Sequence, residues 1–171
     1  ANYWLAKHRI PKRNISEAVY LKSNPNGDPF VTANPKSQTE WFLYGVGIGL
    51  FWGEGNKINK HSVRLCNTDP DLIRWFLTFL RIIYKVDDKK LRFGLQIFSD
   101  MDPSETKAFW VQQLQVQPSQ FQKVVVTRSI KTGTYRKKTQ YGVLTIYFSN
   151  TKLRDTIVGA IDELRSNQLP T

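Results

Sequence analysis

The residue in this chain with the clearest chemical potential is Glu54, which directly follows a glycine-rich apolar segment. Residues 43 to 57 read LYGVGIGLFWGEGNK. A single carboxylate is a weak site for a hard divalent cation, because such a cation prefers several oxygen ligands. Two carboxylates at a twofold interface, together with phosphate oxygens and water, are sufficient. Glu54 therefore suggests a metal-dependent reaction at a site that two chains share.

Three glycines in this segment recur at a spacing of four residues. Gly45, Gly49 and Gly53 stack on one face of a helix and leave a groove without side chains, into which a second helix can pack at backbone distance. A glycine inside a helix lowers the stability of the helix by about 1 kcal/mol relative to alanine, so we expect the groove to make a contact that offsets this loss. We predict that these glycines form the interface of a homodimer.

The helix that carries the glycines has a clear start. Pro35 precedes Ser37, and Ser37 with Glu40 has the form of a capping box, which predicts a helix from Gln38 to Glu54. From residue 42 to residue 53 every residue is apolar or glycine, so we expect the helix to be covered on every side. The apolar run falls short of the roughly 20 residues that cross a bilayer, and no membrane partner is expected.

The run GIGLFWGEG at residues 47 to 55 resembles the LAGLIDADG motif of homing endonucleases. Gly49-Leu50 matches the central Gly-Leu of the motif, Glu54 matches its final acidic residue, and Gly55 matches its closing glycine. Two departures are that Trp52 stands where many members carry an earlier acidic residue, and that aspartate is commoner than glutamate at the final position. The resemblance implies an α+β fold in which an antiparallel, saddle-shaped sheet lies over DNA and the helices pack on its other face.

The same resemblance implies roles for individual residues. Glu54 is expected to bind Mg²⁺ or another divalent cation, with a backbone carbonyl of Gly53 as a further ligand. We expect Lys57 or Lys123 to stabilise the charge that develops during the reaction. Since the chain holds one copy of the motif, the implied enzyme is a homodimer that hydrolyses both strands of a roughly palindromic DNA site. Two alternatives stay open: a sequence-specific DNA-binding regulator that does not cut, and an RNA-splicing maturase on the same scaffold.

The charge of the chain agrees with a nucleic-acid partner rather than a small-molecule substrate. The 171 residues carry a net charge of +11, and the pI is near 9.8. The stretch from residue 121 to residue 140 holds six basic residues and no acidic one, although a basic loop can also be a solvated turn. Basic and amide side chains on the strands and on this loop are the predicted DNA contacts. These residues are Arg64, Arg92, Gln96, Lys123, Arg128, Lys131, Arg136, Lys137 and Lys138.

We divide the chain into a basic arm and linker at residues 1–36, an endonuclease-like domain at 37–166 and a tail at 167–171. The opening YWLAKHRIPKRNISEA also resembles the end of a helix-turn-helix recognition helix and its basic tail. Cys66 is the one cysteine, which suits a reducing compartment. We therefore expect a cytoplasmic protein, nucleoid-associated in a bacterium. His8 and His61 share no ligand spacing with Cys66, so no zinc site is expected, and a Cys66 nucleophile served by His61 is less favoured than a small residue in a strand.

After Glu54 the pattern predicts strand, helix, strand, helix, strand, strand and helix. The expected strands are 62–67, 91–97, 123–128 and 142–148. Helices are expected to begin at Pro70 and Pro103, where Asp102 acts as a cap rather than as a carboxylate pair with Asp100. The last expected helix, 150–164, packs through Leu153, Ile157, Ile161 and Leu164. The helix after Pro103 and the short first strand depart from the half-saddle of the family.

Overall fold

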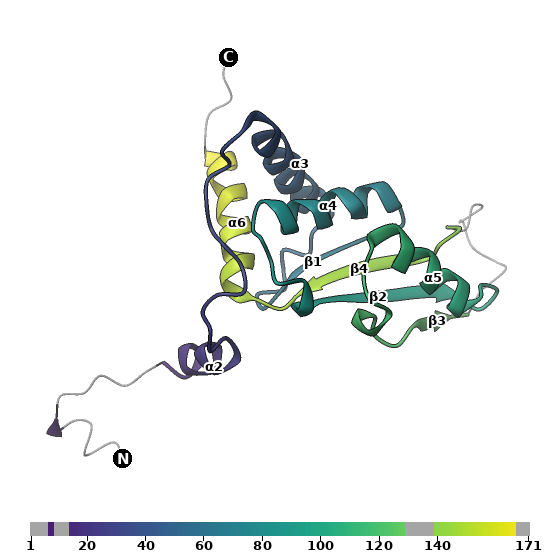
Figure 1. Ribbon diagram of the computed structural model, residues 1–171, viewed down its shortest axis with the longest axis horizontal. Helices are drawn as coiled ribbons and strands as arrows, with labels where there is room; N and C mark the ends of the chain where they lie inside the picture. Colours follow the sequence, from purple (N-terminus) through teal and green to yellow (C-terminus); the bar gives the residue numbers. More distant parts are fainter. Residues whose placement is uncertain (1–6, 9–13, 129–138, 167–171) are drawn as a thin grey trace.

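The structure is a computed structural model that describes residues 7–8, 14–128 and 139–166. Within them the chain forms a mixed α+β fold, which confirms the predicted class (Figure 1). The helices are α2 (Ile15–Ser23), α3 (Gln38–Glu54), α4 (Pro70–Ile82), α5 (Pro103–Leu114) and α6 (Thr151–Ser166), with short 3₁₀ turns η1 (Asp88–Lys90) and η2 (Pro118–Gln120). The strands are β1 (Val63–Asn67), β2 (Leu91–Phe98), β3 (Val125–Thr127) and β4 (Val143–Phe148).

The four strands form one sheet in the order β1-β4-β2-β3. Strand β4 pairs antiparallel with β1 and β2, whereas β3 pairs parallel with β2. The prediction of an antiparallel sheet is therefore wrong for β3. The reason is the additional helix: α5 and η2 lie between β2 and β3, and a connection of this length carries the chain back to the starting end of the sheet, so that the next strand runs in the same direction.

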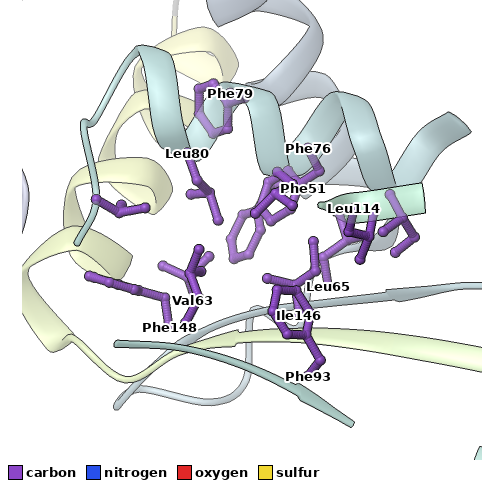
Figure 2. Close-up of a cluster of buried hydrophobic side chains, with 14 of the residues drawn as sticks. Phe51, Val63, Leu65, Phe76, Phe79, Leu80, Phe93, Leu114, Ile146 and Phe148 are labelled. Atoms are coloured by element: carbon purple, nitrogen blue, oxygen red, sulfur yellow. The ribbon is translucent and has the colours of Figure 1, made fainter. Parts of the chain in front are cut away.

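The helices cover one face of the sheet, and the hydrophobic core lies between the two layers. On β2, Leu91, Phe93 and Leu95 are buried, while Arg92 and Gln96 on the opposite face are exposed. Figure 2 shows side chains from helices and strands meeting in this core, among them Phe51, Phe76, Val63, Ile146 and Phe148. The predicted alternation of this strand is confirmed.

The predicted helix starts are confirmed by cap hydrogen bonds. The Ser37 hydroxyl accepts from the backbone N–H of Glu40 at 3.2 Å, at the start of α3. The Asp69 carboxylate accepts from the backbone N–H of Asp71 at 2.8 Å, at the start of α4. The Asp102 carboxylate accepts from the N–H of Glu105 at 2.7 Å, which confirms its role as the cap of α5.

Two later predictions are wrong in detail. The strand predicted at 123–128 is shorter than expected, because β3 contains three residues. In the sheet, β2 lies between β3 and β4. Leu164 does not pack in the core: its exposed fraction is 51%, whereas Leu153, Ile157 and Ile161 are buried. Leu164 lies on the same side of α6 as these residues, but residues 162–166 are all exposed, so the last turn of the helix extends past the core.

Part of the predicted arm packs on the domain. The Tyr20 hydroxyl donates to the Asp28 carboxylate at 2.6 Å, and the Lys152 ammonium pairs with the same carboxylate at 3.1 Å. The bond from Tyr20 and the charge of Lys152 hold the pKa of Asp28 below its ordinary value. Phe30 is buried in the core, and the Val31 N–H donates to the backbone carbonyl of Tyr84 at 2.7 Å. The chain is thus attached to the domain before residue 37, and α2 lies at one end of α6 (Figure 1).

The glycines of α3 fall into two groups with different surroundings. Gly47 faces α4, and a Cβ atom there would lie 2.1 Å from the Phe79 ring. By contrast, beyond the neighbouring residues and the nearby backbone of α3 itself, no atom of the described residues lies within 4 Å of a Cβ atom built at Gly45, Gly49 or Gly53. We call these three residues the glycine face. Gly47 thus permits the packing of α3 on α4, whereas the glycine face has no such role within the chain.

We expect Gly47→Ala to lower the free energy of unfolding by about 1 to 3 kcal/mol, because the added methyl group overpacks the contact with Phe79. Gly159→Ala is the matched control, because Gly159 lies on α6, away from the glycine face. It should raise the free energy of unfolding by up to about 1 kcal/mol, because its methyl group enters open space and alanine is the better helix former. Chemical denaturation of both variants measures the difference, and shifts of the same sign would contradict it.

Candidate nucleic-acid interface and metal site

A hollow of about 460 Å³ lies between the segment that follows α3 and the exposed face of the sheet. We call it the Glu54 hollow. It unites three of the predicted site residues, Glu54, Lys57 and Arg64. The full lining is Glu54, Gly55, Asn56, Lys57, Ile58, Arg64, Cys66, Thr145 and Tyr147. A groove of this size, with one carboxylate and two cationic groups on its walls, suits a polar ligand.

Glu54 is the last residue of α3, and its side chain is exposed at the hollow. Helix α3 ends there because Gly55 turns into extended backbone, where it forms a bridge with Leu65 of β1. The N–H of Gly55 donates to the Phe51 carbonyl at 2.9 Å. A Cβ atom at Gly55 would lie 2.4 Å from that carbonyl oxygen, so only glycine fits. The turn places the Glu54 carboxylate where the helix meets the sheet.

Lys57 and Lys123, the two predicted catalytic lysines, lie in different places. The Lys57 ammonium donates to the Trp52 carbonyl at 2.6 Å, which satisfies a backbone acceptor at the C-terminus of α3. Lys123 precedes β3, which lies at the opposite edge of the sheet from β1. Three strand spacings separate these edges, a distance of roughly 14 Å. The structure therefore brings Lys57, and not Lys123, into the Glu54 hollow of the same chain.

The segment between α3 and β1 is held in one conformation by polar side chains. The Asn56 side-chain oxygen accepts from the backbone N–H groups of Ile58 at 3.1 Å and Asn59 at 3.0 Å. From α6, the guanidinium of Arg154 donates to the Asn59 carbonyl at 3.1 Å and to the Lys57 carbonyl. The Arg154 side chain is only 14% exposed. The sequence alone did not suggest this role, because Arg154 is far from residues 57 and 59 in the chain.

We expect Arg154→Met to loosen the wall of the Glu54 hollow. The substitution keeps an unbranched side chain but removes the charge-assisted hydrogen bonds to two carbonyls, a loss of about 1.5 to 3 kcal/mol. Backbone amides of residues 57–62 should then exchange with solvent faster, as measured by hydrogen–deuterium exchange. Arg74→Met, which removes an exposed ion pair with Asp71 on α4, is the control and should leave these amides unchanged. Equal exchange in both variants would contradict the role of Arg154.

The exposed face of the sheet carries the predicted contacts Arg64, Arg92 and Gln96. The Arg64 Nε donates to the Ser62 hydroxyl at 2.7 Å, which fixes the direction of its side chain. Arg92 donates to the Leu91 carbonyl at 2.7 Å, and the Gln96 amide donates to the Thr127 hydroxyl at 3.1 Å. We call this surface the open sheet face.

The remaining predicted contacts are only partly described. Lys123 and Arg128 flank β3 and are exposed. Lys131, Arg136, Lys137 and Lys138 lie outside the described residues. Cys66, expected as a small residue of a strand, lies in β1 with its side chain exposed in the Glu54 hollow. Tyr147 was not foreseen, although its alternation with Thr145 and Val143 on β4 is a signal that could have identified it.

A second hollow of about 460 Å³ lies near the start of β2. Its two arginines are already engaged with the protein. Arg81 pairs with Asp88 at 2.9 Å and donates to the Leu114 carbonyl at 3.2 Å, and Arg92 donates to the Lys89 carbonyl at 2.6 Å. We therefore interpret this hollow as a structural junction between α4, η1 and β2.

Within residues 7–8, 14–128 and 139–166, no group of three or more His, Cys, Asp or Glu side chains is placed to hold a metal ion. None of the helices in this part of the chain is both long and apolar enough to cross a membrane. Comparisons of the chain with protein-family models, with curated proteins and with solved structures find no match in any of the three. The glycine face, the Glu54 hollow and the open sheet face are therefore the features from which a function is inferred.

Proposed function

We propose that this protein is a site-specific DNA endonuclease that acts as a homodimer and uses Mg²⁺ or another divalent cation. One observation carries the proposal: α3 has a bare glycine face, and this helix ends at an exposed carboxylate, Glu54, in a hollow beside the open sheet face. Each part of the proposal corresponds to one of these surfaces.

The dimer is supported by the surroundings of the glycine face. Trp41 lies four residues before Gly45 and Trp52 three residues after Gly49, so both share the side of α3 that carries the glycine face. Their exposed fractions are 55% and 40%, and Phe42 is 61% exposed. Large exposed aromatic residues around a bare helix face are typical of protein interfaces, where such residues contribute much of the binding energy. A second α3 fits this surface because two bare faces allow close backbone contact.

The metal site is supported by the kind of ligand that Glu54 provides. A carboxylate is the oxygen ligand that Mg²⁺ prefers, and Glu54 is exposed where a twofold axis along the glycine face would bring its copy near. When bound, the metal supplies the polarisation of the scissile phosphate and lowers the pKa of the attacking water. Lys57 adds positive charge to the same hollow, which favours an anionic phosphate there.

The DNA is assigned to the open sheet face. This face presents Arg64, Arg92 and Gln96, and the chain as a whole has a net charge of +11. Helices on one side and a polar sheet on the other also agree with the half-saddle of homing endonucleases, which we propose as the fold family. The parallel strand β3 and helix α5 are the departures from that pattern.

The test is incubation of the protein with a library of duplex DNA sites in the presence of Mg²⁺, followed by sequencing of the ends. We expect double-strand breaks at one defined, roughly palindromic sequence, with four-base 3′ overhangs, and no breaks when a chelator replaces Mg²⁺. Enrichment of bound but uncut DNA would instead identify a regulator. Binding of a structured RNA without any cleavage of DNA would identify a splicing factor.

A further inference from the structure

Tyr147 is an aromatic residue in the middle of the open sheet face. It belongs to β4, which lies between β1 and β2. The strand register places Arg64 directly opposite Tyr147 on one side and Arg92 directly opposite it on the other. Three neighbouring strands therefore present the row Arg64, Tyr147, Arg92 across the face.

The Tyr147 ring leans over the neighbouring strand, where Gly94 leaves room for it. A Cβ atom at Gly94 would lie 2.9 Å from the ring carbon Cε2 and 3.2 Å from the hydroxyl oxygen. The Arg64 guanidinium carbon lies 5.2 Å from the ring centre, in cation–π contact. A bare backbone below the ring and a guanidinium over it thus set the position of Tyr147.

Arg64 is held in its position before any ligand binds. Its Nε donates to the Ser62 hydroxyl at 2.7 Å, and this hydroxyl donates to the Asn59 side chain at 3.0 Å. The Tyr147 ring and Arg64 also line the Glu54 hollow, together with Lys57. Groups that are ordered in advance lose less conformational entropy when they bind a ligand. The pair is therefore suited to bind a planar group that enters the hollow from the open sheet face.

We propose that the open sheet face binds single-stranded nucleic acid, with one unpaired base stacked on the Arg64 guanidinium and on the Tyr147 ring that supports it. In a duplex the faces of each base are covered by its neighbours, so a groove offers base edges but no base face. Single strands expose these faces, and aromatic rings and guanidinium planes on a sheet bind them by stacking. Lys57 in the same hollow and Arg92 opposite Tyr147 on β2 supply positive charge for the phosphates. This binding requires neither a metal nor a dimer, so it goes beyond the proposed endonuclease.

The experiment measures fluorescence anisotropy of a labelled twelve-residue oligothymidine and of an abasic strand of the same length, with EDTA present and at one fixed salt concentration. The two strands carry the same phosphates, so the difference in affinity reports base stacking alone. We expect the protein to bind oligothymidine about tenfold more tightly. The same pair of strands made of RNA shows whether ribose is preferred, and a preference for bases over abasic sugar in either series supports the proposal.

Substitutions of Tyr147 show whether its aromatic ring is responsible for the preference. Tyr147→Phe keeps the ring and should keep the preference for oligothymidine over the abasic strand. Tyr147→Leu should reduce this preference to about one, with the affinity for the abasic strand unchanged. Trp75→Leu, which removes an exposed aromatic ring of α4 outside the open sheet face and the Glu54 hollow, is the control and should behave as the unmodified protein.

Two outcomes would overturn the proposal: equal affinity of the unmodified protein for the base-carrying and abasic strands in both the DNA and the RNA series, or a preserved preference in a folded Tyr147→Leu variant. Gly94→Ala is a second test, because its methyl group displaces the ring without removing it. It should lower the preference as well. Since EDTA blocks the proposed cleavage, a failure of stacking leaves Mg²⁺-dependent duplex cleavage untouched, and a failure of cleavage leaves this binding untouched.

Discussion

Glu54→Gln is expected to reduce cleavage of duplex DNA by at least about 1,000-fold while the affinity for the duplex stays within about twofold. A metal ion contributes several kcal/mol to the stabilisation of charge in phosphoryl transfer, and each 1.36 kcal/mol corresponds to a factor of ten in rate. The amide keeps the size of the side chain but removes its negative charge. Because Glu54 is exposed at the end of α3, the fold should not change.

The measurement is single-turnover cleavage of the identified DNA site with Mg²⁺, together with duplex binding in the presence of Ca²⁺. Glu105→Gln is the matched control, since Glu105 is also an exposed glutamate of a helix but lies on α5. It should cleave as the unmodified protein does. Undiminished cleavage by the Glu54 variant would remove the catalytic role from this residue and the metal from the proposed site.

Gly49→Leu is expected to convert the homodimer into a folded monomer and to reduce cleavage by at least about 100-fold. The leucine side chain projects from the centre of the glycine face and prevents close contact of two α3 helices. Each overpacked side chain in a tight interface weakens the association by about 1 to 3 kcal/mol. Because the interface is twofold, the substitution acts in both copies. Within the monomer, beyond the neighbouring residues and the nearby backbone of α3, no atom of the described residues lies within 4 Å of the new Cβ atom, and leucine is a better helix former than glycine.

Sedimentation equilibrium, with and without duplex DNA, measures the assembly, and thermal unfolding shows that the variant is folded. Gly159→Leu is the matched control, because Gly159 is a glycine of α6 whose Cβ position is also open in the described part of the chain. This control should remain a dimer and should cleave normally. A dimeric Gly49→Leu protein would place the interface elsewhere, and a monomeric unmodified protein on DNA would exclude the shared site.

The local structure of this chain follows from short stretches of sequence. Ser37, Asp69 and Asp102 each cap a helix through a hydrogen bond to a backbone N–H two or three residues away, so the start of each helix is encoded within a single turn. The alternation in β2 needs only the period of a strand with one buried face. The four-residue spacing of the glycines and the position of Glu54 at the end of α3 were also predictable, because both depend on a short stretch of sequence.

The sheet order and the contents of the site depend on contacts between distant segments. The direction of β3 is set by the length of the connection through α5, which a local pattern does not reveal. The difference between Gly47 and Gly45 appears only when α4 places Phe79 against one of them. Similarly, strand order rather than residue type separates Lys57 from Lys123.

The sequence by itself thus determined the elements, their buried faces, and a bare helix that ends in an acid, because these depend on hydrogen bonds and periodicities that span a few residues. Only the tertiary structure decided which side chains share a site. Arg154 reaches the loop at residues 57–59 from the last helix, and Tyr147 meets Arg64 across two strands. Such contacts between distant residues depend on how the helices pack on the sheet, and this packing is a property of the whole chain.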